Sequence, residues 1–182
     1  MRVVAGSARG RPLEAPPGRE VRPTTDRVRE ALFNALASLD VVTGADVLDL
    51  FAGTGALGIE ALSRGAAHTT FVERDARARA IVQRNLDATG LGAAATVVGG
   101  TAQRFVETTT AHFDLALLDP PYAFADWDEL LARVDADIVV VETDREIDLG
   151  PRWEVVRPKW YGSTLVVIAR AAHEAPASPS HP

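Results

Sequence analysis

The chain has 182 residues, 47% of them apolar and 24% charged, which is enough for one domain with a substantial core and too little for two catalytic domains. The absence of cysteine excludes disulfides, thiolate zinc sites and a cysteine nucleophile, and four scattered histidines give no pattern for a metal site. No apolar run reaches the roughly 18 residues of a membrane-spanning helix, and the N-terminus has no apolar signal core. We therefore expect a cytoplasmic protein that holds no metal and contacts no membrane.

The net charge of −6 is unevenly distributed along the chain. Residues 1–29 carry seven arginines and three acidic residues, whereas the rest of the chain has a net charge of −10. We interpret residues 1–22 as a basic N-terminal arm, folded as a loop or small hairpin, because concentrated positive charge favours nucleic-acid phosphates. The candidate phosphate contacts are Arg9, Arg11, Arg19 and Arg22 in the arm, and Arg27 and Arg29 on the helix that follows.

Residues 23–170 have the pattern of one α/β domain. A helix is expected from Asp26, because apolar residues recur at 3.6-residue spacing up to Leu39. Helical patterns also lie between the strands, for example over residues 78–86 and 127–134. Asp75 is a candidate cap for the first of these two, and Asp126 and Glu129 are spaced like a capping pair before the second. Apolar, β-branched runs predict seven strands, at residues 46–51, 69–72, 95–98, 113–118, 137–141, 153–157 and 164–168.

The alternation of strands and helices predicts a mostly parallel sheet. Only residues 158–163 separate the last two strands, which is too short for a crossover, so these two should form an antiparallel hairpin. Residues 171–182 are expected to be a disordered tail.

A glycine-rich loop, Asp49 to Gly58, follows the first strand and opens a helix. Gly53 and Gly55 allow the backbone to approach a ligand, and the helix N-terminus offers free amides. Glu73, 20 residues after Gly53, ends the second strand, where an acid can bind both ribose hydroxyls of an adenosine. The alternative is that the glycines only form a tight turn. The same loop pattern is also typical of nicotinamide dehydrogenases, so a second motif is needed to identify the cofactor.

That motif is Asp119-Pro120-Pro121-Tyr122 at the end of the fourth strand. The prolines stiffen the loop and can hold the Asp119 carboxylate and the Pro120 carbonyl in fixed positions. Two such acceptors suit a planar amino group, and Tyr122 can stack on the attached base. The alternative is a Pro-Pro turn with a surface carboxylate. The first and fourth strands flank the switch point of a doubly wound sheet, so both motifs should share one crevice.

Together these motifs resemble a class I S-adenosylmethionine-dependent methyltransferase of the amino-methylating group. More narrowly, residues 2–13, 22–36, 49–66 and 159–164 resemble the RsmD family, whose members methylate N2 of guanine 966 in 16S ribosomal RNA. The resemblance implies a Rossmann-like seven-stranded sheet of order 3-2-1-4-5-7-6 with strand 7 antiparallel. It also implies S-adenosyl-L-methionine as donor, S-adenosyl-L-homocysteine as product, and the small ribosomal subunit as partner.

The resemblance also assigns residues to roles. The acid that often contacts adenine after strand three is absent, and backbone amides or Thr101, next to Ala102, are expected to replace it. Lys159 and Tyr161, near the hairpin turn, are candidate RNA contacts, while Trp153 and Trp160 are expected to pack. The cofactor residues are Asp49, Phe51, Gly53, Thr54, Gly55, Gly58 and Glu73, and the guanine residues are Asp119, Pro120, Pro121 and Tyr122.

We expect an in-line transfer without a covalent enzyme intermediate. Asp119 orients the amino group and accepts its proton, or the proton leaves to water. Other hypotheses stay open: an amino-directed methyltransferase acting on DNA adenine-N6 or protein glutamine-N5, and a non-catalytic rRNA-binding assembly factor. The small size of the chain, without a target-recognition domain, weighs against the DNA option. It shows no extra dimerisation element, so a monomer is expected.

Overall fold

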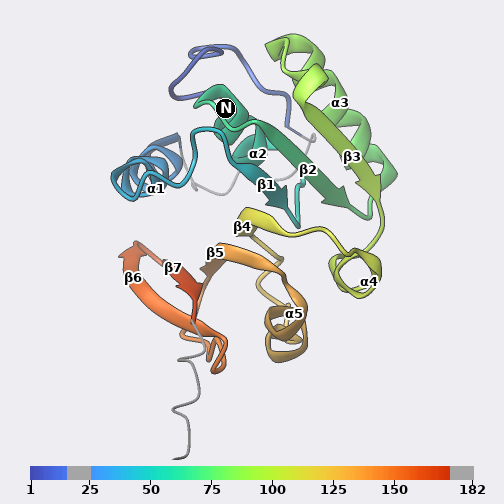
Figure 1. Ribbon diagram of the computed structural model, residues 1–182. Coiled ribbons are helices and arrows are strands. Elements are labelled where there is room, and N and C mark those ends of the chain that lie inside the picture. The colour runs from blue at the N-terminus through green and yellow to red at the C-terminus, as the bar shows by residue number, and fades with distance from the viewer. Residues whose placement is uncertain (16–25, 173–182) are drawn as a thin grey trace, which may run out of the picture.

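The computed structural model describes residues 1–15 and 26–172, which form a seven-stranded sheet with helices on both faces (Figure 1). The sheet order is β3-β2-β1-β4-β5-β7-β6. The elements in chain order are α1 (Asp26–Ser38), β1 (Asp46–Asp49), α2 (Ala56–Ser63), β2 (His68–Glu73), α3 (Ala76–Thr89), the 3-10 helix η1 (Gly92–Ala94), β3 (Ala95–Gly99), α4 (Ala102–Thr108), β4 (Phe113–Leu118), α5 (Trp127–Arg133), β5 (Ala136–Thr143), β6 (Trp153–Tyr161) and β7 (Thr164–Ala171).

The strand directions confirm the predicted topology. Strands β1 to β5 run parallel, and β7 runs antiparallel to both of its neighbours, β5 and β6. All seven predicted strands are present, in the predicted order. Strand β6 continues to Tyr161, beyond the predicted end at residue 157. Its apolar pattern stops early because β6 is an edge strand with most side chains exposed.

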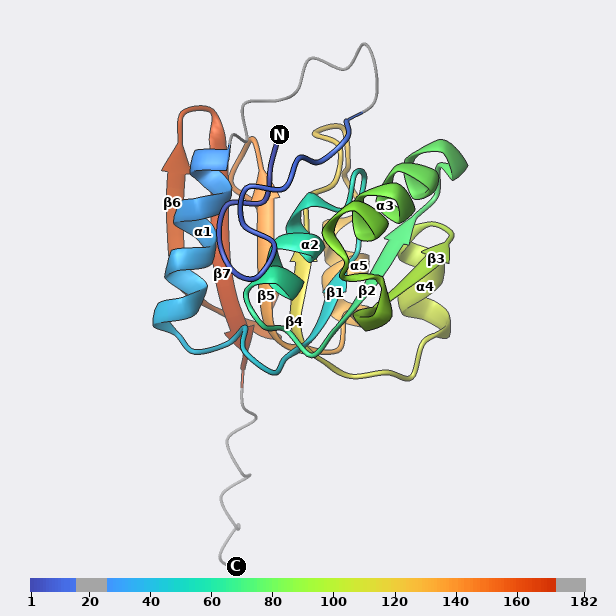
Figure 2. The ribbon, with the colours of Figure 1, turned by 90° about the horizontal axis from the view of Figure 1, so that it is seen from above.

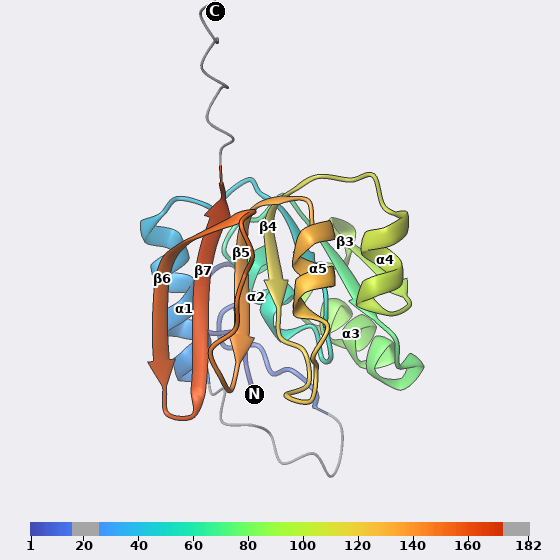
Figure 3. The same ribbon diagram turned by 90° about the horizontal axis from the view of Figure 1, so that it is seen from below.

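The sheet separates two apolar cores. Helices α1, α2 and α3 cover one face, and α4 and α5 cover the other (Figures 2 and 3). Strand β4 is buried on both sides: Leu115 and Leu117 pack in the first core, while Ala116 and Leu118 pack in the second. Burial of each large apolar side chain contributes about 1.5–3 kcal/mol, so the centre of the sheet contributes much of the stability of the fold.

The predicted helix caps have different outcomes. The Asp75 side chain accepts a hydrogen bond from the Arg77 N–H at 2.9 Å, which confirms it as the cap of α3. Asp126 precedes α5, but its side chain makes no capping bond, so the predicted capping pair is wrong. The physical reason is the backbone: the ψ angle of Asp126 is 45°, outside the extended region that directs a side chain back onto the first turn.

The described part of the predicted arm, residues 1–15, packs against α2. An isolated bridge between Arg2 and Pro12 closes it into a small hairpin. The hairpin approaches α2 so closely at Gly6 that a Cβ there would lie 1.7 Å from the Ser63 carbonyl oxygen. Gly6 also has a φ of +81°, so both the backbone conformation and the close approach require glycine. The rest of the arm, and the predicted tail beyond Ala172, lie outside the described residues.

Glu60 of α2 connects the hairpin to the helices. Its fully buried carboxylate accepts from the backbone N–H groups of Val4 (2.8 Å) and Ala5 (3.0 Å). It also pairs with Arg64 at 2.8 Å and with the buried Arg29 of α1 at 3.4 Å. One carboxylate therefore joins three segments that lie far apart in the sequence.

We expect Glu60→Gln to lower the free energy of unfolding by about 3–5 kcal/mol, because it removes the buried carboxylate that pairs with Arg29 and Arg64 and leaves the Arg29 guanidinium only the partly exposed Asp26. Urea denaturation measures this change. Glu129→Gln is the control, since it breaks an exposed pair with Arg133 and should change stability by less than about 1 kcal/mol. Equal stabilities of the two variants would show that Glu60 does not organise these segments.

Candidate active site

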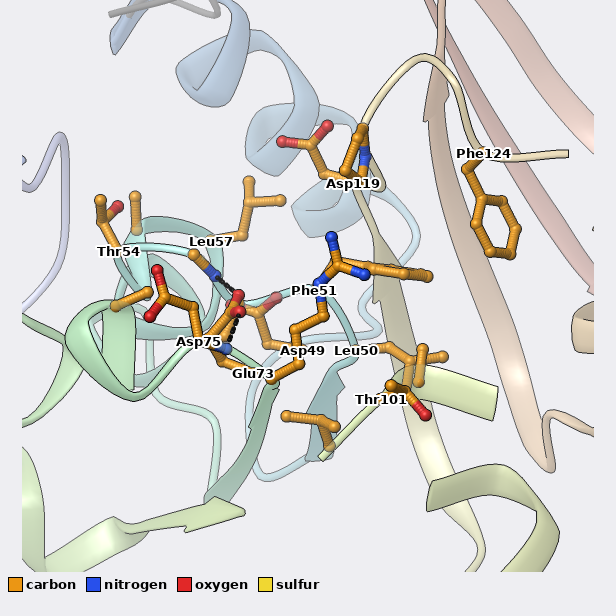
Figure 4. Close-up of a pocket in the computed structure, with 18 of the residues that line it drawn as sticks. Asp49, Leu50, Phe51, Thr54, Leu57, Glu73, Asp75, Thr101, Asp119 and Phe124 are labelled. Carbon is orange, nitrogen blue, oxygen red and sulfur yellow. Dashed lines mark hydrogen bonds between the residues drawn. The ribbon is translucent and has the colours of Figure 1, made fainter. Parts of the chain in front are cut away.

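The carboxyl ends of β1, β2 and β4 and the segment after β3 line one cleft of about 1000 Å³. Strands β1 and β4 are neighbours, but the chain leaves β1 for α2 on one face and leaves β4 for α5 on the other. The two connections diverge and open a crevice between them. The predicted site residues that line this cleft, several of them labelled in Figure 4, are Arg29, Asp49, Phe51, Gly53, Thr54, Glu73, Thr101, Ala102, Asp119 and Pro121.

The glycine loop turns sharply between β1 and α2. Gly53 and Gly55 have φ angles of +54° and +78°, a backbone region that favours glycine. Gly58 lies within α2 and faces β2, where a Cβ would come within 2.3 Å of the Phe71 ring. Gly55 and Gly58 do not line the cleft themselves. They allow the loop and α2 to approach the sheet closely enough to form its wall.

Asp49, at the end of β1, is a buried carboxyl group beneath the cleft. Its Oδ2 accepts from the backbone N–H of Gly58 at 2.9 Å. Burial raises the pKa of Asp49 to about 7; the Gly58 hydrogen bond opposes this rise, and the charge of Glu73 adds to it. A cationic group placed in the cleft would favour the ionised form of this carboxyl group.

Glu73 ends β2 and holds the loop from the other side (Figure 4). One carboxylate oxygen accepts from the Gly53 N–H at 2.9 Å, and the other accepts from the Asp75 N–H at 2.8 Å. Each oxygen keeps further acceptor capacity. The side chain can therefore accept two hydroxyl groups while it keeps the glycine loop in place.

The segment after β3 contributes backbone and a hydroxyl to the cleft. Thr101 is the N-cap of α4, and its side chain accepts from the Arg104 N–H at 3.2 Å. The Thr101 hydroxyl can still donate a hydrogen bond, and Gly100 and Ala102 line the cleft beside it. Contact of Thr101 or Ala102 with an adenine stays a prediction.

The Asp119–Tyr122 loop presents two of its four residues to the cleft. Asp119 and Pro121 line it, and Figure 4 shows Asp119 across from Asp49 and Glu73. Pro120, in the same loop, is buried. The Tyr122 side chain is directed to β7, where its hydroxyl oxygen lies 3.2 Å from the Thr164 hydroxyl oxygen. Stacking of Tyr122 on a base stays a prediction.

Two residues that the sequence interpretation did not single out complete this wall. Phe124 lines the cleft and packs edge-on against Phe51 at 5.4 Å and Trp127 at 5.1 Å between ring centroids. Arg145, after β5, donates to the carbonyl oxygens of Tyr122 (2.8 Å) and Phe124 (2.7 Å). The aromatic residue two positions after the Asp-Pro-Pro-Tyr motif could have indicated Phe124. No local pattern marks Arg145, because it reaches the loop from another strand.

Most of the candidate RNA contacts lie within the described residues, and two lie outside them. Arg9, Arg11 and Arg27 are exposed, and Arg11 also donates to the Ala88 carbonyl at 2.8 Å. Lys159 is exposed at the end of β6, with its ammonium group 5.0 Å from the centre of the Tyr161 ring. These residues can reach a phosphate backbone. Arg19 and Arg22 lie outside the described residues.

The prediction of a phosphate contact at Arg29 is wrong. Its side chain is only 2% exposed and is bound by the Glu60 and Asp26 carboxylates and by the Arg2 carbonyl oxygen. Sequence position placed Arg29 on the first turn of α1, but the helix directs that side chain into the interior. Arg29 is therefore a structural residue.

Comparisons with known proteins agree with this architecture. The family described as Conserved hypothetical protein 95 matches residues 1–170. The protein YlbH of Bacillus subtilis is 39% identical over 92% of this chain and 97% of its own length. Ribosomal RNA small subunit methyltransferase D of Escherichia coli K12 is 37% identical over 89% of this chain and 85% of its own length. The solved structure of the Escherichia coli protein yhhF has a TM-score of 0.84 at 35% identity and covers 94% of this chain and 97% of that one.

No helix within residues 1–15 and 26–172 is long and apolar enough to cross a bilayer. The sheet order and the antiparallel strand β7 are those of class I methyltransferases. By sequence similarity over nearly its whole length and by its fold, the chain belongs to the RsmD family.

Proposed function

We propose that this chain transfers a methyl group from S-adenosyl-L-methionine to the exocyclic N2 of a guanine in 16S rRNA on the small ribosomal subunit. The observation that carries the proposal is that Asp119 and the carboxylates of Asp49 and Glu73 line one cleft. Membership of the RsmD family supports rRNA as the substrate, because the E. coli relative is a ribosomal RNA small subunit methyltransferase. Guanine 966 follows from the family resemblance.

The chemistry of the cleft fits the donor. S-Adenosylmethionine supplies an electrophilic methyl group on a cationic sulfonium. Asp49 offers a carboxylate to a cation, and both oxygens of Glu73 keep acceptor capacity that suits ribose hydroxyls. The aromatic and aliphatic side chains of Phe51, Leu57 and Ile81 give the cleft apolar walls that exclude water from the reacting groups.

The residues on the opposite wall are suited to hold the acceptor. The Asp119 carboxylate and the Pro120 carbonyl would accept hydrogen bonds from the guanine amino group, leaving its nitrogen aimed into the cleft. Asp119 can also accept the proton that becomes acidic during transfer. Catalysis then rests on positioning and electrostatics, with no covalent enzyme intermediate. Arg9, Arg11 and Arg27 would hold the RNA backbone.

Replacement of Asp119 by Ala should slow methyl transfer at least about 100-fold and leave cofactor affinity nearly unchanged. Single-turnover transfer of a labelled methyl group to small subunits from cells that lack the gene measures the first effect, and calorimetric binding measures the second. Asp128→Ala, on the exposed side of α5, is the control. Full turnover by Asp119→Ala would refute the assigned role.

Replacement of Asp49 by Asn should stabilise the free protein and weaken cofactor binding. The folded-state pKa of Asp49, about 7, lies above its unfolded value, so its contribution to stability is present below about pH 4 and lost as pH rises through about 7. At about pH 8 the variant should therefore gain about 1–3 kcal/mol in free energy of unfolding, because no buried charge remains.

Cofactor affinity should move in the opposite direction. Asp49→Asn should bind S-adenosylmethionine about 10-fold more weakly than the wild type at about pH 8, and the rise in wild-type affinity between about pH 6 and pH 8 should disappear. Calorimetry at both pH values checks this. Equal affinities of the two proteins at about pH 8 would contradict a role for the Asp49 charge.

Replacement of Arg145 by Met should lower the rate constant of transfer about 10-fold, because the loop that carries Asp119 loses two hydrogen bonds to its carbonyl oxygens. Cofactor affinity should not change. Arg133→Met, which removes an exposed arginine from α5, is the control. An unchanged rate constant in Arg145→Met would show that the loop needs no such support.

A further inference from the structure

The edge strand β6 carries an apolar surface that the active site does not use. Val155, Val156 and Trp160 are 49%, 41% and 48% exposed, and they are three of the five large apolar side chains exposed in the described parts of the chain. Trp153, on the same strand, is buried and donates from Nε1 to the Leu131 carbonyl at 3.0 Å. The predicted packing role is therefore confirmed for Trp153 and wrong for Trp160.

Trp160 lies on the same edge of the sheet as the cleft. Strands β4, β5 and β6 point in one direction (Figure 3), so their carboxyl ends share that edge. Trp160 pairs with Leu165 of β7, and the adjacent Thr164 contacts the hydroxyl of Tyr122 in the Asp119–Tyr122 loop. Neighbouring strands are about 4.8 Å apart, so Trp160 lies only a few strand widths from that loop.

The charges around Trp160 suit a polyanion. Between Val155 and Ser163 the chain has two cations, Arg157 and Lys159, and no acidic residue. Neither cation forms an ion pair with any residue that the structure describes. Lys159 is paired with Val166 of β7, whose side chain packs in the core under α1. Trp160 is paired with Leu165 of β7, whose side chain packs in the core on the other face. The edge therefore presents an aromatic ring on one face and cations on the other.

The backbone of β6 disfavours pairing with a strand from another protein. Pro158 has no N–H to donate, and the pairing register shifts between Val155 and Arg157. Both features interrupt the regular row of backbone groups that strand addition requires. An exposed aromatic ring on one face of an edge strand and cations on the other can instead bind unpaired nucleotides that cross the edge, by stacking of a base and attraction of its phosphates.

We propose that Trp160 stacks on an unpaired rRNA base that flanks the target guanine, while Arg157 and Lys159 bind the adjoining phosphates. This inference rests on the proposed function and extends it to a second contact outside the cleft. It assigns the β6 edge a role in holding the RNA while the target base enters the cleft, and it requires no change in the chemistry at Asp119.

Tryptophan fluorescence provides a direct test. The chain has three tryptophans, and Trp127 and Trp153 are only 5% and 6% exposed, so stacking should quench mainly Trp160. A short single-stranded RNA should quench the wild type and leave Trp160→Phe largely unquenched. Trp160→Ala should raise the KM for small subunits from cells lacking the gene about 10-fold, with kcat and cofactor affinity unchanged.

Three variants separate stacking from charge. Trp160→Phe keeps an aromatic ring and should retain most of the affinity that Trp160→Ala loses, and Val156→Ala should behave as the wild type. The double variant Arg157→Gln, Lys159→Gln should reduce the salt dependence of binding by about 1.4 units of log-log slope, since each phosphate contact with a single strand contributes about 0.7, whereas Trp160→Ala should not reduce it.

The inference would be overturned if Trp160→Ala had the same KM as the wild type and the same degree of quenching by RNA. It would also be overturned if the wild type sedimented as a dimer and Trp160→Ala as a monomer, since the surface would then be a protein interface. Failure of the proposed function has a different signature, since the wild type itself would then transfer no methyl group to the subunits.

Discussion

The hydrogen bonds between the glycine loop and two acidic side chains are the constraint on which the cleft depends. Gly58 donates to Asp49 and Gly53 donates to Glu73, so the ends of β1 and β2 are tied to the loop and helix that follow β1. The loop can reach these carboxylates only because its glycines adopt positive φ angles and α2 lies against Phe71. The same carboxylates face the cleft, so the groups that shape the loop are also those suited to bind a cation and two hydroxyls.

The N-terminal hairpin is held against this loop by a second set of polar contacts. Asn85 of α3 accepts from the Glu14 N–H at 2.7 Å and donates to the Thr54 carbonyl at 2.9 Å. Glu60 fixes the start of the hairpin through its buried carboxylate. The hydrogen bonds of Arg11 with the Ala88 carbonyl and of Ser7 with the Ser63 carbonyl place the segment that carries Arg9 and Arg11 at the C-terminal ends of α3 and α2, away from the glycine loop.

Much of the fold could be predicted because local patterns determine it. Apolar runs identified all seven strands, and the short connection before β7 indicated its antiparallel direction. The glycine loop and the Asp119 motif were recognisable because each is continuous in sequence. The errors arise where tertiary packing decides the outcome. Arg29 is turned inward by α1, and Trp160 is left exposed by its position on an edge strand. Arg145 was not found, since its contacts with Tyr122 and Phe124 join segments from different strands.

The central claim is that one cleft brings a methyl donor and a guanine amino group together on adjoining strand ends. Mass mapping of 16S rRNA from cells with and without the gene tests it most directly. The account predicts that one guanine carries an N2-methyl group only when the gene is present, and that the gene encoding Asp119→Ala does not restore it. An identical methylation pattern in both strains would contradict the account.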